Sequence, residues 1–489
     1  MKIVLAAVPL ITTRIPPLSI ALLAGQMKKD GHTVRSFDFN IETYHAVEPE
    51  LKSYWTFYKG FQWLDDAHFR DFIYPNIIAK NLEAWASKIL KQKPDVVGIS
   101  VTKSPAAMHL ARVLKEKKPR VKIVIGGPRC TKISNDSEMV PGPYFDAVVH
   151  HEGETCLSEL VRQYELTGKL RAVPGTSVLG DDGTISHEGL REPVMDLNAM
   201  PFPDFDDMPL KLYVDADYPA ANDLELPFYT SRGCPARCNF CMDYKMWDVK
   251  YRQKSPQRII AEMEYLYERY GMDRFYLIEL IFNGHHGRMR ELATELAKRK
   301  HRFTFWGHGR IDPRLDVETL QLLKDAGFRW FIFGLESGSD RVLNLMRKGY
   351  GKETASKVLR AMKQVGINCS VNIVTGFPGE TWGEFFETVQ FIHDHRDCLS
   401  MPPAVMECCA TQGSDIYLYP EKFGIEVTSG RGIDERGWRS VDGKNTLEVR
   451  LLRKEMMHKV FKELDFGKSV DTTPAAAQRP LSPTAHNGQ

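Results

Sequence analysis

Several features are scarce or missing in this 489-residue sequence, and each absence excludes a class of protein. It has no apolar run of about 18 residues or more, so no membrane-spanning helix is expected. Its net charge is only +2, which gives no sign of a nucleic-acid or membrane-surface partner. The apolar residues 1–8 end at Pro9 without a cleavage signal, and they predict a buried strand rather than a secretory leader.

Cysteine is also scarce, and its number is odd. Nine cysteines in a chain of this length do not suggest a disulfide scaffold, and a reducing cytoplasm is the expected compartment. Cys234, Cys238 and Cys241 nevertheless form a C-x3-C-x2-C array. Three thiolates this close along a chain are typical of an iron–sulfur cluster. A zinc site would need a fourth Cys or His at matching spacing, and no further C-x2-C or H-x3-H pair lies near the array.

Residues 1–165 alternate apolar strands with amphipathic helices. Strands are expected at 2–7, 33–39, 95–100, 121–128 and 146–149. This repetition predicts a doubly wound, Rossmann-like α/β sheet with a ligand cleft at the carboxyl ends of its strands. Residues 166–222 are expected to be a linker with one small hairpin, because Gly180 to Gly183 is a strong turn signal.

The strand–helix rhythm returns about six times in residues 223–400. The expected strands are 228–231, 275–278, 303–306, 330–334 and 370–374, with 403–408 as a candidate sixth. Units of this kind predict a partial (β/α)6 barrel of the TIM type, with its site at the carboxyl ends of the strands. The cysteine array directly follows the first of these strands.

Residues 401–467 are expected to form a small helix-rich C-terminal region, and residues 468–489 a disordered tail. A helix is predicted over Leu447 to Leu464, with this core-facing stripe: Leu447, Leu451, Leu452, Met456, Val460 and Leu464. Cys408 and Cys409 are adjacent, so their side chains point in different directions from a strand. Buried packing is expected for at least one of them, against the alternative of a redox or second-cluster role.

The cysteine array, with Phe240 just before its last cysteine, resembles the signature of the radical SAM enzymes. A four-iron cluster normally takes four cysteines, so three leave one iron open. The resemblance implies that Cys234, Cys238 and Cys241 ligate a 4Fe-4S cluster whose open iron chelates S-adenosylmethionine. In that family, an electron from the cluster cleaves adenosylmethionine to a 5′-deoxyadenosyl radical.

Residues after the later strands resemble the adenosylmethionine contacts of this family. Glu279 stands where many relatives carry an Asp that contacts the amino group of adenosylmethionine. The alternative is that Glu279 forms an ion pair with Arg310 or another cation. The resemblance implies that the Arg310 guanidinium forms a bidentate pair with the carboxylate of adenosylmethionine. The resemblance also implies ribose contacts from Glu336 and Ser337, and a glycine behind the adenine at Gly376.

The first domain resembles the cobalamin-binding domain that precedes the barrel in one large class of radical SAM enzymes. The match rests on short pieces in the right order, at 16–19, 31–32, 97–100, 126–128 and 152–154. It implies candidate cobalamin contacts from Ser100, Gly126, Gly127, Glu152 and Gly153. The alternative is that the two adjacent glycines only close a turn. Residues 1–160 lack an Asp-x-His-x-x-Gly loop, so no protein histidine is expected on cobalt.

Together these resemblances imply a cobalamin-dependent radical SAM enzyme, with methyl transfer to an unactivated carbon or a phosphorus centre as the leading hypothesis. A cyclase or ring-rearranging enzyme of the anaerobic porphyrin-cyclase type is the alternative. A tRNA methylthiotransferase-like enzyme ranks lower, because residues 1–160 hold only Cys130 and Cys156. The expected partners are a small-molecule substrate and an electron donor such as flavodoxin or ferredoxin, with no nucleic acid.

Overall fold

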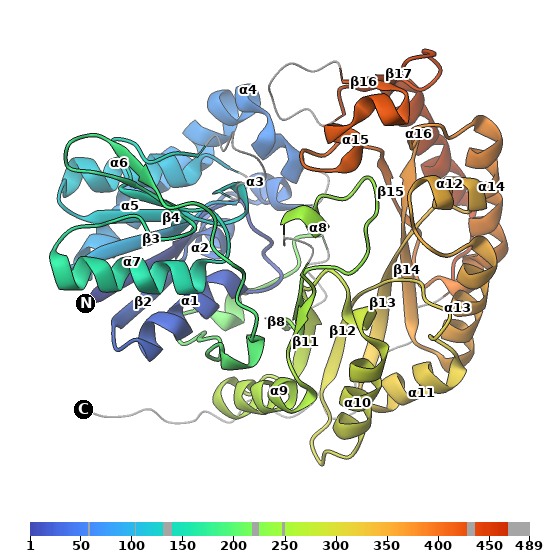
Figure 1. Ribbon diagram of the computed structural model, residues 1–489, viewed down its shortest axis with the longest axis horizontal. Coiled ribbons are helices and arrows are strands. Elements are labelled where there is room, and N and C mark those ends of the chain that lie inside the picture. Colours follow the sequence, from blue (N-terminus) through green and yellow to red (C-terminus); the bar gives the residue numbers. More distant parts are fainter. Residues whose placement is uncertain are drawn as a thin grey trace. The chain divides into compact units, whose positions relative to one another are not determined.

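The computed structural model describes residues 1–56, 59–102, 104–130, 139–217, 224–246, 250–427 and 436–467. The chain divides into two compact units, Met1–Pro227 and Phe228–Gln489 (Figure 1). Each unit is built on its own β-sheet. The tail expected at 468–489 lies outside the described residues.

The sheet of the first unit has seven strands in the order β2-β1-β3-β4-β5-β6-β7. Their bounds are β1 Lys2–Ala7, β2 Thr33–Asp38, β3 Val96–Ser100, β4 Lys122–Gly126, β5 Ala147–Val149, β6 Thr176–Leu179 and β7 Ile185–His187. The first five strands pair in parallel, and β6 and β7 add as antiparallel neighbours. The predicted doubly wound sheet is confirmed. The hairpin expected in a linker belongs instead to this sheet, because β6 pairs directly with β5.

Helices connect these parallel strands and cover the sheet. The main ones are α1 Leu18–Lys29, α2 Phe39–Ala46, α5 Ala79–Lys91, α6 Ala106–Lys117 and α7 Gly153–Thr167. Between α2 and α5 the chain inserts α3 Pro49–Lys52, η1 Ser53–Trp55, η2 Gly60–Leu64, α4 Asp66–His68 and η3 Phe69–Ile78. This insertion packs through aromatic contacts, such as that of Trp55 with Trp63 at a ring-centroid distance of 5.3 Å.

The sheet of the second unit has six strands in the order β15-β14-β13-β12-β11-β8. Their bounds are β8 Leu226–Phe228, β11 Arg274–Leu277, β12 Thr304–Gly309, β13 Phe328–Glu336, β14 Asn368–Thr375 and β15 Ala404–Glu407. Each strand pairs in parallel with its successor from β11 to β15. This order confirms the predicted partial barrel.

Helices cover the outer side of this curled sheet (Figure 1). They are α9 Pro256–Tyr270, α10 His286–Ala297, α11 Val317–Asp325, α12 Asp340–Leu345, α13 Lys352–Val365 and α14 Trp382–His395. Successive side chains of a strand point to opposite faces of the sheet. One face carries buried side chains such as Phe275, Phe305 and Phe331, and the residues between them on the other face are only half-buried.

The C-terminal region contains α15 Asp415–Leu418, η9 Pro420–Phe423, a β16 Ile425–Val427 and β17 Trp438–Ser440 hairpin, and α16 Leu447–Glu463. The predicted long helix is therefore confirmed. Cys408 is buried in a core cluster with Trp438 and Phe377, as expected for one of the two adjacent cysteines.

The predicted core-facing stripe of α16 is wrong. The buried residues of this helix are Arg450, Arg453, Met457 and Phe461, while Leu451 and Leu452 are 40% and 48% exposed. The arginines are buried because each has local partners. Arg453 forms an ion pair with Glu380 at 2.8 Å, and Arg450 stacks on Trp438 at 3.7 Å.

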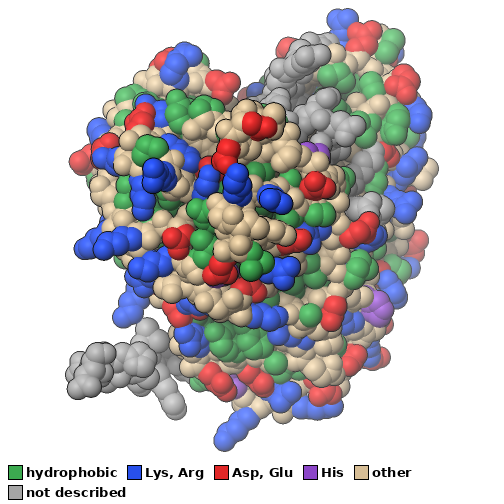
Figure 2. Space-filling model, turned by 60° about the vertical axis from the view of Figure 1, so that its left-hand side comes forward, with side chains coloured by type: hydrophobic (Ala, Val, Ile, Leu, Met, Phe, Trp, Pro, Cys, Tyr) green, Lys and Arg blue, Asp and Glu red, His purple; other side chains and the backbone are tan. Residues whose placement is uncertain are grey.

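Surface charge shows no clear segregation in the view of Figure 2. Lys and Arg side chains are interspersed with Asp and Glu over the described residues of this face. No helix in the described ranges combines the length and apolar character that a bilayer crossing requires.

Replacing Arg453 by Leu should strongly destabilise the protein, because Glu380 would be left buried without its counter-ion. We expect a loss of about 3–5 kcal/mol in the free energy of unfolding. Urea titration measures it. The matched control is Lys459→Leu, which removes an exposed pair with Glu455 on the same helix and should change the free energy by only about 0.3–0.5 kcal/mol. Equal losses in the two variants would contradict the assigned role of the buried pair.

Candidate functional site

The start of the cysteine loop is held by the buried carboxylate of Glu279. The backbone N–H of Thr230 donates to Glu279 Oε2 at 2.9 Å, and the Ser231 hydroxyl donates to the same oxygen at 2.6 Å. Burial raises the pKa of Glu279, and the nearby Arg288 opposes that rise. The neighbouring cation is thus Arg288 of α10, not Arg310. A contact of Glu279 with adenosylmethionine stays a prediction.

Arg288 adds a second restraint at the same place. Its guanidinium donates to the Thr230 carbonyl at 2.9 Å and to the Lys254 carbonyl at 3.3 Å. Lys254 in turn donates its backbone N–H to the Thr230 carbonyl at 2.8 Å. The short antiparallel pair β9 Ser231–Arg232 and β10 Arg252–Gln253 lies at this point. The backbone that leads into Cys234 is therefore fixed on both sides.

The loop then brings its three thiols near one another. Gly233 has a φ of +83°, which suits glycine, and this turn leads directly into Cys234. The Cys241 N–H donates to the Cys238 carbonyl at 3.1 Å. Burial raises the pKa of the Cys234 and Cys241 thiols, and the charge of Cys238 raises both further. The thiols are thus close enough to affect one another electrostatically.

This donor set fits an iron–sulfur cluster. Three cysteine thiols from one short loop are the usual kind of ligand for such a cluster. Among the described residues, no three Cys, His, Asp or Glu side chains are close enough together to hold a single metal ion. A cluster is a larger body than one ion, so its ligands stand further apart. The role of the three cysteines as cluster ligands stays a prediction.

Asn239, inside the cysteine loop, ties the loop to the end of α12. Its side-chain amide donates to the Leu345 carbonyl at 2.6 Å, and its backbone N–H donates to the Met346 carbonyl at 3.2 Å. Next to it, Phe240 is half-buried and meets the Phe377 ring edge-on at a centroid distance of 6.4 Å. Phe240 thus packs the loop against the core, and a direct cofactor contact stays a prediction.

Arg310 follows β12 and reaches the cysteine loop. Its Nη1 lies 3.7 Å from Cys238 Sγ, and its guanidinium lies 5.6 Å from the centre of the Tyr350 ring. Asn283 fixes its backbone in both directions, because the amide of Asn283 donates to the Arg310 carbonyl at 2.7 Å and accepts from the Arg310 N–H at 2.9 Å. The predicted cation therefore lies beside a predicted cluster ligand.

Glu336 ends β13 in a left-handed backbone conformation, with a φ of +67°. Such a conformation is unfavourable for a residue with a side chain, and it often marks functional sites. The carboxylate of Glu336 lies 3.2 Å from the ammonium group of the buried Lys348. Lys348 also lies 5.9 Å from the centre of the Phe240 ring. A buried ion pair therefore stands next to the cysteine loop.

Sequence reasoning missed Lys348, Tyr350 and Asn283. The only available signal for Asn283 was its position, because it lies in the same segment after β11 as Glu279. Lys348 and Tyr350 follow a short helix and form no motif by spacing. The Tyr350 hydroxyl donates to the Gly334 carbonyl at 2.8 Å, which braces the end of β13.

Two of the predicted adenosylmethionine contacts have structural partners in the protein. The Ser337 hydroxyl is fully buried and lies 3.0 Å from the Thr388 hydroxyl of α14. Gly376 has a φ of +73°, and a Cβ built there would lie 2.4 Å from Cγ of Arg450. Gly376 thus lets α16 approach β14 closely. The ribose and adenine roles of these residues stay predictions.

The predicted cobalamin contacts lie at the carboxyl ends of β3, β4 and β5, at one edge of the first sheet. Ser100 is the last residue of β3, and Gly126 the last of β4. Gly127 has a φ of +120°, and a Cβ built there would lie 2.5 Å from the Val101 carbonyl oxygen. The fold itself therefore requires Gly127. Small residues at this edge also fit a large flat ligand, as cobalamin would need.

Glu152 and Gly153 begin α7 after β5. The Glu152 carboxylate accepts the backbone N–H of Val194 at 3.0 Å. A Cβ at Gly153 would make ordinary contact with Leu23, so this glycine has room for a side chain. His150 lies at the same edge, but its ring nitrogens bond to the Cys130 carbonyl at 3.0 Å and the Ser177 hydroxyl at 2.7 Å.

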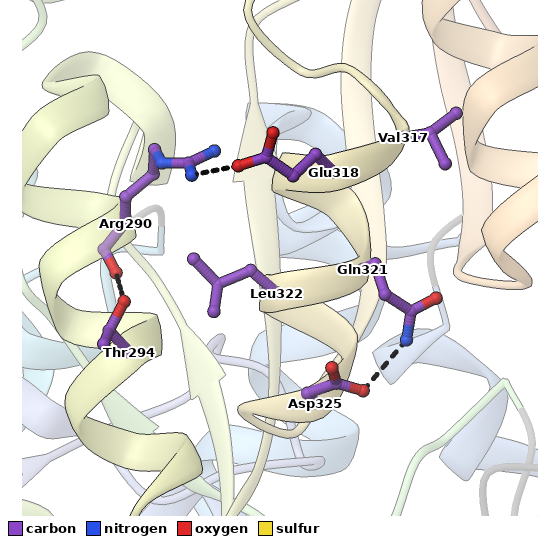
Figure 3. Close-up of a pocket in the computed structure, with 7 residues that line it drawn as sticks. All are labelled: Arg290, Thr294, Val317, Glu318, Gln321, Leu322 and Asp325. Atoms are coloured by element: carbon purple, nitrogen blue, oxygen red, sulfur yellow. Dashed lines mark hydrogen bonds and ion pairs between the residues drawn. The ribbon is translucent and has the colours of Figure 1, made fainter.

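A separate hollow lies on the outer helical layer between α10 and α11 (Figure 3). Its polar side chains bond within the hollow: Arg290 to Glu318 at 2.5 Å, and Gln321 to Asp325 at 2.9 Å. It contains none of the predicted site residues, so no cofactor role is assigned to it.

Family comparisons agree with this arrangement. The model of the radical SAM superfamily matches residues 228–392, and the model of the B12 binding domain matches residues 2–161. The chain therefore has a radical SAM domain preceded by a B12-binding domain.

Curated relatives are similar to this chain at low identity. An uncharacterized methyltransferase of Pyrococcus horikoshii is 27% identical over 308 residues, 62% of this chain and 65% of the relative. The anaerobic magnesium-protoporphyrin IX monomethyl ester cyclase of Rubrivivax gelatinosus is 26% identical over 366 residues, 72% of this chain and 64% of the relative. The cytidylyl-2-hydroxyethylphosphonate methyltransferase of Streptomyces wedmorensis is 25% identical over 417 residues, 78% and 73% respectively. The chain thus spans slightly under two thirds of the first two.

Solved structures show the same fold. The radical S-adenosylmethionine methyltransferase TsrM from Kitasatospora setae, with cobalamin and a [4Fe-4S] cluster bound, has a TM-score of 0.62 at 17% identity, covering 88% of this chain and 78% of that one. The cobalamin-dependent S-adenosylmethionine radical enzyme OxsB has a TM-score of 0.61 at 19% identity, covering 86% and 56%. At these identities the likeness concerns the fold alone.

Replacing Gly376 by Ala should destabilise the protein more than the same change at Gly443. Both glycines have a similar positive φ, of +73° and +69°, but the new Cβ meets Arg450 only at position 376. We expect Gly376→Ala to lose about 1–3 kcal/mol more in the free energy of unfolding. Urea titration of the two variants checks this, and equal losses would refute the close approach of α16.

Proposed function

We propose that this protein is a cobalamin-dependent radical SAM methyltransferase that acts on an unactivated carbon or phosphorus centre of a small molecule. The observation that carries the proposal is the group of three neighbouring thiols beside Arg310 and the Glu336–Lys348 pair, in a chain that also has a B12-binding domain. Two of the curated relatives described above are named methyltransferases.

The roles of the protein groups follow from their positions. Cys234, Cys238 and Cys241 would hold the 4Fe-4S cluster, and small residues at the ends of β3 to β5 would hold cobalamin. When bound, these groups supply the electron that cleaves adenosylmethionine and the methyl group that is transferred. Arg310 would bind the carboxylate of adenosylmethionine, because its guanidinium lies 3.7 Å from Cys238 Sγ and can form two hydrogen bonds to a carboxylate.

Lys348 and Glu336 would keep this region rigid and polar. The two charges are buried together, so removal of either leaves the other without compensation. Glu336 would accept hydrogen bonds from the ribose, and Lys348 would hold its carboxylate in place. Phe240 and Phe377 would exclude water from the loop.

The electron would come from a small soluble donor of the flavodoxin or ferredoxin type, and the protein would work in the cytoplasm without a nucleic-acid partner. Low-potential clusters need such a donor and a reducing compartment. The proposal is supported by cysteines that form no disulfide among the described residues.

Replacing Cys238 by Ala should abolish cleavage of adenosylmethionine. The anaerobically reconstituted variant should lose the cluster signal in electron paramagnetic resonance, and 5′-deoxyadenosine should fall to background. Cys409→Ala is the matched control, because it removes a thiol that lies outside the cysteine loop. The Cys409 side chain is half-buried, and its thiol lies 3.5 Å from the Glu407 carbonyl oxygen. Persistence of 5′-deoxyadenosine in Cys238→Ala would rule out the cluster assignment.

Cobalamin should bind in stoichiometric amount when the protein is reconstituted, which the absorption spectrum after gel filtration measures. A methyltransferase should then form S-adenosylhomocysteine together with 5′-deoxyadenosine, because one adenosylmethionine gives the methyl group and another the radical. The alternative function is that of a cyclase, and the similarity to the cyclase of Rubrivivax gelatinosus supports it. A cyclase should form 5′-deoxyadenosine without S-adenosylhomocysteine. Protein that binds no cobalamin would refute the methyltransferase proposal.

A further inference from the structure

The C-terminal region holds the segment that follows β14, although it lies outside the part of the chain that the radical SAM model matches. That match ends at residue 392, whereas α16 begins at Leu447. The helix packs against β14 and β15. Residues 376–380, here called the glycine segment, directly follow β14 and receive hydrogen bonds from α16 and from the residue two positions before it.

Asn445, just before α16, binds the first two carbonyls of the glycine segment. Its side-chain amide donates to the Gly376 carbonyl at 3.0 Å and, more weakly, to the Phe377 carbonyl at 3.4 Å. Asn445 is only 4% exposed. Its own backbone is fixed by β17, because its N–H donates to the Ser440 hydroxyl at 2.9 Å and its carbonyl accepts the Ser440 N–H at 2.9 Å. The two carbonyls are therefore bound by a side chain whose backbone is itself held in place.

The N–H of the same glycine depends on α16 as well. The Glu380 carboxylate accepts the Gly376 N–H at 2.6 Å, and Arg453 donates to the same oxygen of Glu380 at 2.8 Å. Both charged side chains are buried. Because Arg453 is part of α16, the N–H and the carbonyl of Gly376 are both fixed by way of the C-terminal region.

The chemistry of Asn445 indicates that its N–H donors matter more than its packing. Its Oδ1 is buried and accepts no hydrogen bond within the described part of the chain. A buried polar atom without a partner lowers stability, and an apolar side chain of the same branched shape would avoid that loss. An apolar side chain could not, however, donate to the carbonyls of Gly376 and Phe377.

The C-terminal region also contacts the cysteine loop. The backbone N–H of Ile416 in α15 donates to the Asn239 carbonyl at 3.2 Å. Phe377 of the glycine segment is buried in one core cluster with Trp438, and Phe240 of the cysteine loop packs against this cluster. The glycine segment and the cysteine loop are therefore held by the same part of the chain.

We propose that Asn445 is a positioning residue for adenosylmethionine. It keeps the glycine segment in the shape that receives the adenine, and it acts through the backbone of Gly376 and Phe377 without touching the ligand. The inference deepens the proposed function and rests on the adenine role predicted for Gly376. Residues beyond the matched radical SAM domain are then required for full affinity toward adenosylmethionine.

Equilibrium dialysis with S-adenosylmethionine tests this role in the anaerobically reconstituted protein. Asn445→Leu keeps the branched shape and removes both donors, so the Kd for adenosylmethionine should rise about tenfold. The iron content of the protein should not change, because no cluster ligand is removed. The rate of 5′-deoxyadenosine formation at saturating adenosylmethionine should stay close to that of the wild type for the same reason.

The matched control is Asp316→Ala. The Asp316 carboxylate also binds a backbone group, the Thr319 N–H at 2.8 Å, but it does so at the start of the outer helix α11. Loss of this helix cap should lower the midpoint of urea unfolding and leave the Kd for adenosylmethionine unchanged. General destabilisation would instead raise the Kd in both variants.

A second variant, Asn445→Ala, keeps the test decisive if Asn445→Leu folds poorly, because alanine needs no extra space. It should raise the Kd by a similar factor. An unchanged Kd in the Asn445 variants, or an equal rise in Asp316→Ala, would overturn the positioning role; if 5′-deoxyadenosine still forms, the proposed function stays intact. A raised Kd in the Asn445 variants alone, in protein that forms no 5′-deoxyadenosine, would support the positioning role and refute the proposed function.

Discussion

The buried carboxylate of Glu279 is the constraint on which the cysteine loop depends. Glu279 accepts hydrogen bonds from the backbone N–H of Thr230 and from the hydroxyl of Ser231. These two residues lie just before the cysteine loop. A buried polar group that loses its hydrogen-bond partner is costly, so these bonds are not easily given up. Because Arg288 binds the Thr230 carbonyl from the other side, this backbone cannot shift without breaking several buried bonds at once.

Local rigidity of this kind matters because the loop itself has little regular structure. Its middle is fixed by Asn239, which donates to the carbonyls of Leu345, the last residue of α12, and of Met346. Arg310 reaches Cys238 from a third direction, with a backbone clamped by Asn283. The thiols are therefore positioned by residues that follow strands or end helices of the second unit. These residues meet at one edge of the sheet because β11 to β15 run in the same direction.

Most of the fold could be predicted from sequence, because buried parallel strands are short apolar runs bounded by turn residues. Strands β1, β3 and β4 follow this rule closely. The C-terminal helix shows where the rule fails: a pattern of leucines cannot reveal that Arg450 and Arg453 are the buried residues. Their burial depends on Trp438 and Glu380, which are distant in sequence. In the site, the cysteines and Arg310 carried a spacing or positional signal, whereas Lys348 is defined only by its partner Glu336.

In the second sheet, the carboxyl ends of the strands and the inner face further down the strands carry different kinds of side chain. At the carboxyl ends, Glu336 forms an ion pair with Lys348, and Arg310 lies beside Cys238 on a backbone fixed by Asn283. Further down the strands, Trp306 and Tyr276 present rings whose replacement would alter the shape of the inner face and leave the strand ends in place. The loop that Glu279 holds therefore does not depend on the rings of the inner face, because its hydrogen bonds come from residues at the strand ends.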